Sequence, residues 1–326
     1  MVFIKGKTIW PLYIPPQDDE LFSSWVCRLA YEHQVKVYTF LKLYFSNEYN
    51  YLARNIDLLK PLELTKTLRT HTFLNDLEID NLFLSSYEGI IFEINTYKTY
   101  TKGILPLGIF NQARRNYGTL YCPLCLNKDI PYFKKKWRLT SSIICVECNI
   151  RLKDRCDKCG NPITYHLNNR SINTSELIHP YSLKFCQCGH DLSTITTKDL
   201  TPTNKEIDYQ LFINNTIDTG YNQITSYSFL FFDGFFLLVE KYLHDSKENR
   251  LRKSLIKKLN RTNIPSQKKN LGLWSLEERR SAILDVYTLF EDYPDTLNNF
   301  LTENNIHKSY VRNNNNYPYW LLKNFI

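Results

Sequence analysis

Eight of the nine cysteines in this 326-residue chain lie in four closely spaced pairs between residues 116 and 200. The pairs are Cys122-Pro-Leu-Cys125, Cys145-Val-Glu-Cys148, Cys156-Asp-Lys-Cys159 and Cys186-Gln-Cys188. Nineteen residues separate Cys125 from Cys145, a spacing typical of zinc sites. Two-residue spacers let both thiolates of a pair reach one ion at ~2.3 Å, and two pairs complete a tetrahedron. The pattern therefore predicts two closed structural zinc sites, with these eight cysteines as ligands and no position left for a substrate.

Two features of these sites stay open at this stage. A sequential arrangement (122/125 with 145/148, 156/159 with 186/188) is expected because each pair then has its nearest partner, and a cross-braced one (122/125 with 156/159, 145/148 with 186/188) is the alternative. In the second site, a histidine is an alternative to one of the cysteines, the candidates being His166, His179 and His190. Gly189 after the last pair is expected to relieve the backbone where its amides turn towards sulfur.

The composition excludes several classes of protein. Apolar residues make up 43% and charged residues 23%, which is close to globular averages, and ten glycines are too few for a collagen-like chain. The most apolar run, residues 229–239, is interrupted by Asp233 and Gly234 and falls short of the ~20 residues of a membrane span. The start lacks a signal-peptide pattern, so we expect a cytoplasmic protein without a membrane contact, whose cysteines are more suited to metal than to disulfides.

The blocks on either side of the cysteines have helical patterns. In the first, apolar residues recur at helical spacing from Leu21 to Ala30, and further helices are expected over 37–45, from Pro61 and over 76–84. Together the blocks predict a mainly α fold with small zinc-binding β/loop modules. It would comprise an N-terminal helix-turn-helix-like domain (1–115), a tandem zinc-finger block (116–200) and a C-terminal helical domain (201–326).

Basic residues gather in two places. The segment 241–270 holds ten of them against two acidic residues in a chain of net charge +8, and its apolar stripe predicts a basic amphipathic helix. A second group lies between the cysteine pairs. Such groups are either solvated faces or contacts for nucleic-acid phosphates. The candidate contacts are Lys134, Lys135, Lys136, Arg138, Lys253, Lys257, Lys258 and Arg261.

Other conspicuous residues have simpler interpretations. Cys27, Trp25 and Trp137 are expected in the core, and Arg28 in an internal ion pair or cap. Trp10 is expected either to dock a partner or to pack on the chain itself. The pair Arg114-Arg115 could face phosphate, although nothing in the spacing requires it.

These motifs together resemble the TniQ/TnsD family of transposon targeting proteins. The resemblance rests on an opening helix, on the first and third cysteine pairs and on C-terminal helices, and it spans nearly the whole chain. Its residues are Pro16, Glu20, Ser24, Trp25, Arg28-Leu29-Ala30, Tyr121-Cys122-Pro123-Leu124-Cys125-Leu126, Trp137-Arg138-Leu139, Cys156-Asp157-Lys158-Cys159-Gly160, Trp274, Glu278, Arg279, Arg280 and Asp292-Tyr293-Pro294. One departure is Cys148, where the family usually has histidine; a thiolate there still binds zinc.

The resemblance implies a non-catalytic target-selection adaptor, in agreement with the lack of P-loop, GxSxG and HExxH motifs. Such an adaptor links an RNA-guided, Cascade-type complex with its guide RNA to a TnsC-like AAA+ ATPase, which recruits the transposase to target DNA. The resemblance also makes a homodimer possible. The alternative is a TnsD-like protein that binds an attachment site sequence-specifically and recruits the same ATPase, but the length of the chain favours the adaptor.

Overall fold

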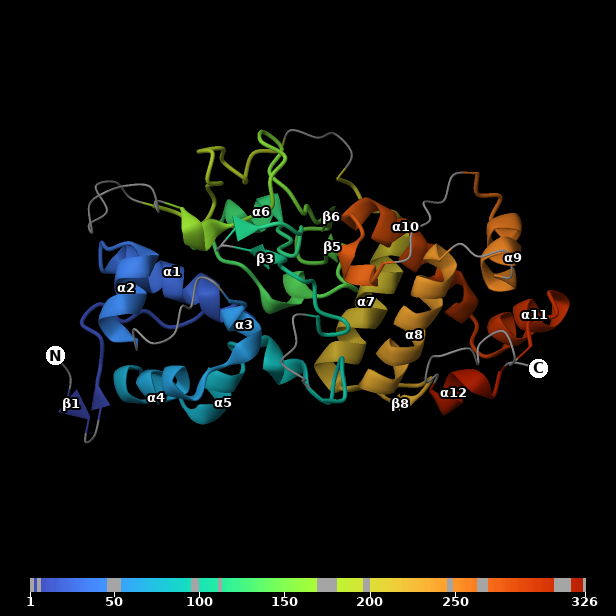
Figure 1. The fold of residues 1–326 in the computed structure, drawn as a ribbon, viewed down its shortest axis with the longest axis horizontal. Coiled ribbons are helices and arrows are strands. Elements are labelled where there is room, and N and C mark those ends of the chain that lie inside the picture. The colour runs from blue at the N-terminus through green and yellow to red at the C-terminus, as the bar shows by residue number, and fades with distance from the viewer. Residues whose placement is uncertain are drawn as a thin grey trace. The chain divides into compact units, whose positions relative to one another are not determined.

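The computed structural model divides the chain into two compact units (Figure 1). The first unit comprises Met1–Ser86, Tyr97–Tyr100 and Ile104–Leu200, and the second comprises Tyr87–Thr96, Thr101–Gly103 and Thr201–Ile326. Within these bounds, the structure describes residues 3–4, 7–45, 54–94, 100–110, 113–168, 181–195, 200–244, 249–262, 269–307 and 318–324. The break near residue 200 coincides with the end of the expected cysteine block.

Helices dominate the described residues, and the strands among them form small two-stranded sheets. The fold is therefore mainly α with small modules around the cysteines, as the sequence predicts. The helix-turn-helix-like arrangement of the first block stays a prediction.

Among its described residues, the first unit begins with two paired strands and five helices. Strands β1 (Phe3–Ile4) and β2 (Lys7–Thr8) pair antiparallel. The helices are α1 (Phe22–Glu32), α2 (Val37–Tyr44), α3 (Ile56–Leu59), α4 (Leu62–His71) and α5 (Asp76–Asp80), followed by a 3-10 turn, η2 (Leu84–Tyr87). The predicted helices are confirmed, except that the one expected over 76–84 ends at Asp80. Asn75 begins α5 with a capping box, because its side chain accepts from the N–H of Glu78 and the Glu78 side chain accepts in return.

Helix α1 is the centre of the first unit's core. Trp25 is completely buried, as expected, and its indole N–H donates to the carbonyl of Ile14. Trp10 is buried as well, with its ring stacked on His71 at 5.8 Å. Of the two expectations for Trp10, the structure therefore bears out packing on the chain itself.

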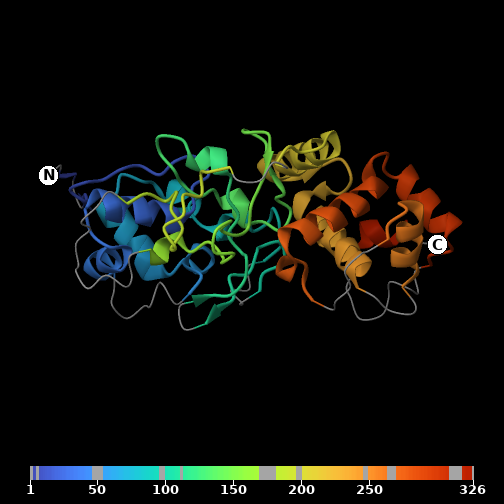
Figure 2. The same cartoon turned by 90° about the horizontal axis from the view of Figure 1, so that it is seen from above.

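The cysteine block packs directly on these helices rather than forming a unit of its own (Figure 2). The N–H of Leu21 donates to Phe133 and that of Leu105 to Arg138, at 2.9 and 2.8 Å. The elements of the block are β3 (Ile109–Phe110), β4 (Ala113–Arg114), α6 (Pro123–Leu126), η3 (Lys135–Arg138), β5 (Ile144–Cys145), β6 (Ile150–Arg151) and η4 (Tyr165–Leu167). Residues on both sides of the boundary expected at residue 115 belong to the same compact unit, and the domain bounds stay a prediction.

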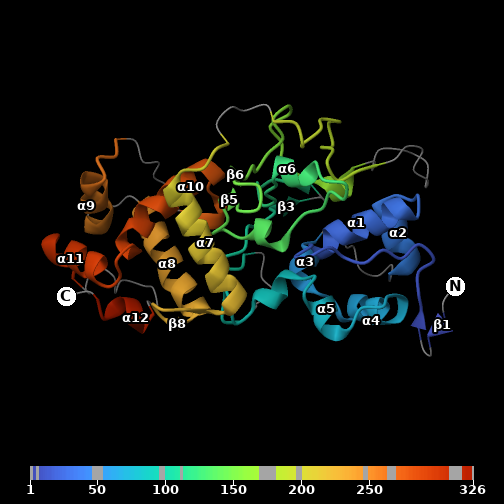
Figure 3. The ribbon, with the colours of Figure 1, turned by 180° about the vertical axis from the view of Figure 1, so that it is seen from behind.

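The second unit is built on three helices that lie side by side, α7 (Asn204–Thr219), α8 (Ser228–Leu243) and α10 (Leu276–Tyr287) (Figure 3). Thr203 and Ser275 begin α7 and α10 with capping boxes. The apolar run of the sequence forms the largely buried α8. The remaining elements are β7 (Tyr221–Asn222), β8 (Ser226–Tyr227), α9 (Arg250–Lys258), η5 (Leu271–Leu273), η6 (Thr288–Phe290), α11 (Asp295–Glu303) and α12 (Tyr319–Leu322). Among the described residues, no helix is long and apolar enough to cross a membrane.

The basic segment differs from the single helix that the sequence predicts. Its first residues complete α8, which ends at Leu243, and α9 covers only Arg250–Lys258. The physical reason is a new helix start, because the Asn249 side chain accepts from the N–H of Arg252. Lys247 and Lys268 lie outside the described residues.

Gly234 of α8 lies against Trp320 of α12, whose indole N–H donates to the carbonyl of Leu230 at 2.8 Å. A Cβ at position 234 would lie 2.4 Å from Cζ2 of that ring. We therefore expect Gly234→Ala to lower the free energy of unfolding of the second unit by about 1–3 kcal/mol, since overpacking outweighs alanine's better helix propensity. Urea denaturation measures this. Adding Trp320→Leu should restore part of the loss, and stabilisation by Gly234→Ala alone would contradict the expected clash.

Candidate metal centres

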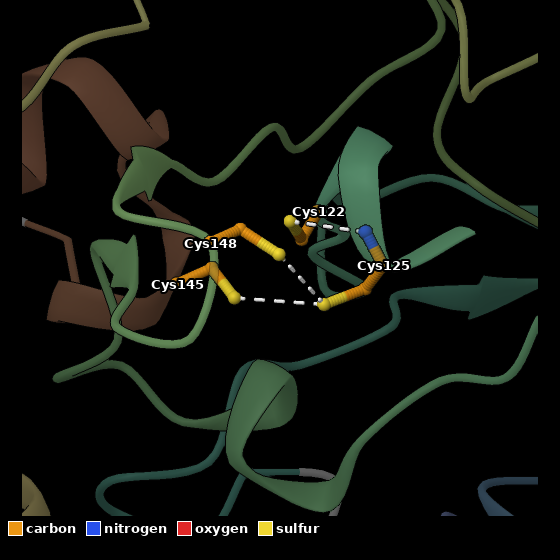
Figure 4. Close-up of side chains that lie close together, drawn as sticks. All are labelled: Cys122, Cys125, Cys145 and Cys148. Carbon is orange, nitrogen blue, oxygen red and sulfur yellow. Dashed lines mark hydrogen bonds between the residues drawn. The ribbon is translucent and has the colours of Figure 1, made fainter. Parts of the chain in front are cut away.

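Four cysteines of the first two pairs converge on one point of the first unit (Figure 4). Cys125 Sγ lies 3.6 Å from Cys145 Sγ and 3.4 Å from Cys148 Sγ, and all four sulfurs lie within 4.8 Å of one another. Four sulfurs at ~2.3 Å from a tetrahedral zinc ion would be about 3.8 Å apart. The observed spacing is thus that of ligands around an ion, and it is too long for a disulfide.

The local fold explains why these sulfurs meet. Cys122 precedes α6, where Pro123 starts the helix, and its Sγ accepts from the N–H of Cys125 at 3.4 Å. Cys145 ends strand β5, and Cys148 lies in the turn to β6. Asn149 takes a left-handed conformation (φ 51°) in that turn, which favours asparagine among non-glycine residues.

The electrostatics of this cluster call for a cation. Hydrogen bonds with Cys125 and Cys145, followed by burial, raise the pKa of Cys122 far above that of a free thiol. A positive ion bound among the four sulfurs would compensate the negative charge of their thiolates. Glu147, between two of the ligands, pairs with Lys134 and with Lys128, the latter at 3.2 Å. These lysines add positive charge near the sulfurs.

The remaining four cysteines form a second, more exposed cluster. Cys156 Sγ lies 3.7 Å from Cys188 Sγ, and Cys159 Sγ lies 3.8 Å from Cys186 Sγ. Cys156 and Cys186 are buried, Cys159 is half-buried and Cys188 is exposed. This site is also of the right size for a metal ion, but water reaches it more easily than the first.

Two similar turns build the second cluster. Cys156 donates its N–H to the carbonyl of Asn161, and Cys186 donates to that of His190, at 3.1 and 2.8 Å. Gly160 (φ 69°) and Gly189 (φ 81°) follow the second cysteine of each pair in the left-handed region. The expectation that Gly189 relieves the backbone is confirmed.

The pairing of the cysteines is sequential, as expected, and the cross-braced alternative is wrong. Among the described histidines, none joins either group of possible ligands. His166 instead faces Arg114, whose Nη2 donates to its Nε2 at 3.0 Å. His179 lies outside the described residues.

The basic residues between the cysteine pairs are largely internal. Lys134 pairs with Glu147, and Lys135 donates to Ser86 Oγ at 3.2 Å. Arg138 is 1% exposed and pairs with Asp57 at 3.2 Å. These three are therefore not exposed residues of a surface loop, as nucleic-acid contacts from that loop would need to be. Lys136 is half-buried.

The basic residues of the second unit are placed differently. Lys253, Lys257 and Lys258 of α9 and Arg261 after it are exposed. The Arg261 guanidinium pairs with buried Asp285 at 2.5 Å, which stabilises the unit. The three lysines are thus the candidates that present charge on the surface.

The expectations for Cys27 and Arg28 are also borne out. Cys27 is completely buried, and burial followed by the charge of Asp57 raises the pKa of its thiol well above the usual value, as suits a core residue. Arg28 forms an internal ion pair with Glu20 at 2.5 Å. Trp137 is buried, as predicted.

Sequence reasoning missed Asp57 and Glu147. Glu147 could have been found from the sequence, because it lies between Cys145 and Cys148 and its charge must therefore be close to the metal ligands. Nothing in the sequence indicated Asp57, since it lies 81 positions from its partner Arg138.

The fold and its clusters define a mainly α protein with two four-cysteine sites, each able to hold one structural metal ion. A family model described as TniQ matches residues 11–152, which include the whole first cluster. Residues 11–152 therefore form a TniQ domain, in agreement with the resemblance to the TniQ/TnsD family. This family acts in transposon target selection. Comparison with curated proteins gives no match.

Proposed function

We propose that this protein is a non-catalytic adaptor, which links an RNA-guided, Cascade-type targeting complex to a TnsC-like AAA+ ATPase for transposase recruitment. The observation that carries the proposal is the TniQ domain over residues 11–152, which ends just beyond the first cysteine cluster. A family role in target selection requires recognition of partners rather than bond chemistry. The clusters agree with this role, because four cysteines complete a tetrahedral site and leave no position open for a substrate.

Both ions are proposed to be zinc. Sulfur–sulfur distances of 3.4 to 3.8 Å fit the tetrahedral geometry that zinc adopts with four thiolates. In this role the metal supplies no chemistry. It joins the loops of the first unit to one another and so stiffens the surfaces on which partners would bind.

Contact with target DNA or guide RNA is proposed for the exposed lysines of α9, Lys253, Lys257 and Lys258, with Lys136 as a further candidate in the first unit. The net charge of +8 supports this proposal, since phosphate contacts by lysine release counterions and attract nucleic acid over long range. A homodimer is consistent with the same role.

We expect a tagged form of the chain, purified from cells that carry its native neighbouring genes, to retain the ATPase, effector subunits and a guide RNA. Mass spectrometry and sequencing of the bound RNA and DNA identify them. A Cys122→Ser/Cys145→Ser variant serves as the control, because a binding surface that needs the folded first unit should be lost with it. Recovery of the ATPase with one chromosomal sequence and no guide RNA would contradict the adaptor and favour the attachment-site reader.

A further inference from the structure

A small polar hollow lies inside the first unit, away from the sulfur clusters. It has room for about one water-sized group. Four elements supply its walls: α1, α3, the β3–β4 hairpin with the residues after it, and the segment from η3 to η4. The polar side chains that matter are Ser23, Asp57, Arg114, Arg138, Tyr165 and His166.

The charges around this hollow do not cancel. Arg138 is paired with Asp57, and its Nη2 donates to the carbonyl of Leu105 at 3.1 Å. Within the described residues, the hydrogen bonds of Arg114 go to neutral groups, because its Nη2 donates to His166 Nε2 at 3.0 Å and to the carbonyl of Arg54 at 3.5 Å, although the charges of Arg138 and Asp57 also act on it. Burial, and then the charges of Arg114 and Arg138, hold the pKa of His166 well below its usual value. Burial lowers the pKa of Arg114 to about 10, so its guanidinium still carries a charge at neutral pH.

Three guanidinium nitrogens at the hollow have hydrogen-bonding capacity to spare. Within the part of the chain that the structure describes, no acceptor lies within reach of Nε or Nη1 of Arg114, or of Nε of Arg138. A buried donor without a partner costs about 1–3 kcal/mol, and more when it is charged. Arg138 is almost completely enclosed, so its position is fixed by Asp57 and not by solvent. The hollow therefore suits an acceptor that also brings negative charge.

Next to Arg114 in the chain and in the same hairpin, a charged side chain and an aromatic ring are exposed to solvent. Arg115 is exposed, and its guanidinium lies over the ring of Phe110 at 4.3 Å from the centroid. Phe110 is itself 55% exposed. An exposed aromatic ring next to arginine is a suitable platform for an unstacked base. Arg54, whose carbonyl Arg114 contacts, is exposed as well.

We propose that Arg114 binds one oxygen of a phosphate group in the backbone of a nucleic-acid strand, with Arg115 and Phe110 contacting the adjacent nucleotide. Arg138 is a positioning residue, which holds the wall of the hollow through its ion pair with Asp57. The hollow has room for one oxygen, so the rest of the phosphate would lie outside it. This inference rests on the proposed nucleic-acid contact and adds a site to it in the first unit. Free phosphate offers the same chemistry and is the other possible source of the ligand.

The test measures binding of the full chain to a fluorescent single-stranded oligothymidylate by anisotropy over a series of salt concentrations. We expect Arg114→Gln to weaken binding about tenfold, the effect of one charge-assisted hydrogen bond, and to reduce the slope against log salt by about one. The matched control is Arg69→Gln, which removes the same charge from an exposed pair with Asp76 in the same unit. Unchanged binding by a folded Arg114→Gln protein, or an equal loss with Arg69→Gln, would overturn the proposal.

Thermal melting supplies a second readout. Inorganic phosphate should raise the melting temperature of the parent protein and not that of Arg114→Gln. If phosphate raises the melting temperature of the parent but Arg114→Gln binds the oligonucleotide as tightly as the parent does, the site takes free phosphate. The nucleic-acid assignment is then overturned. If Arg114→Gln fails to fold, the exposed Arg115→Gln variant tests the proposal in its place. It should also weaken oligonucleotide binding. If Arg115→Gln binds the oligonucleotide as tightly as the parent protein does, the proposal is overturned.

A further variant separates this inference from the function on which it rests. Lys253→Gln/Lys257→Gln/Lys258→Gln removes the exposed charge of α9. If that variant loses binding while Arg114→Gln does not, the phosphate site is wrong and the nucleic-acid contact of the proposed function stands. If no variant changes binding, both fail.

Discussion

Cys122→Ser is expected to release one of about two zinc ions per chain and to unfold the cysteine block of the first unit. The expected loss in free energy of unfolding is several kcal/mol, because structural zinc contributes about 10–16 kcal/mol to the folding of small zinc modules and this unit also has a helical core. The loss should spread to α1, since Leu21 bonds to Phe133 of the same block. Metal analysis by mass spectrometry and urea denaturation followed by circular dichroism measure both effects.

Cys27→Ala is the matched control, because Cys27 is buried in the same unit but takes no part in either cluster. It should keep both ions and lose only the ~1 kcal/mol of a small core truncation. Cys156→Ser should release the other ion at a smaller cost in stability, since that cluster is more exposed. Full stability after prolonged chelation, with no metal bound, would defeat the zinc assignment.

Asp57→Asn is expected to lower the free energy of unfolding of the first unit by about 3–5 kcal/mol, because it leaves the buried Arg138 without its counter-charge. Asp57 also accepts from the N–H and the Oγ of Ser23 at 2.8 and 2.9 Å. Ser23 in turn shares a 2.6 Å hydrogen bond with Tyr165 of η4, so the carboxylate connects α1 and α3 to the segment between the two cysteine pairs of the second cluster. Urea denaturation again gives the measurement.

The control for this prediction is Asp80→Asn, which removes a carboxylate of the same unit from an exposed pair with Lys60. An exposed ion pair contributes about 0–1 kcal/mol, so Asp80→Asn should leave the free energy of unfolding nearly unchanged. The double variant Asp57→Asn/Arg138→Met should lose less than the two single losses added together, as coupled partners do. Similar small losses at positions 57 and 80 would show that the buried pair does not hold the unit together.

Much of the metal site could be predicted because its pattern is local. Spacers of one or two residues within each pair bring two sulfurs to one point whatever the rest of the chain does. Helix α1 could be predicted for the same reason, because Phe22, Trp25 and Leu29 recur at the spacing that places apolar side chains on one face of a helix. The sequential pairing followed from chain proximity, and the structure agrees.

The basic residues could not be placed in this way. Lys135 and Arg138 look like neighbours of Lys136 in a charged surface run, yet their side chains are buried on partners distant in sequence, Ser86 and Asp57. A run of charges indicates electrostatic potential but not the direction in which each side chain points. The break between α8 and α9 was likewise hidden, since it depends on a cap by Asn249 within an otherwise helical pattern.

The sequence by itself determined the mainly α fold, the eight cysteines and their grouping, and the TniQ domain. These depend on short-range spacing and on local motifs, which can be read without knowing the tertiary structure. Only the tertiary structure decided that the first two blocks pack as one unit, that Asp57 neutralises Arg138, and that Arg114 has no carboxylate partner among the described residues. The physical reason is that burial and charge pairing join residues far apart in the chain. Their contribution appears only when the fold has placed both partners together.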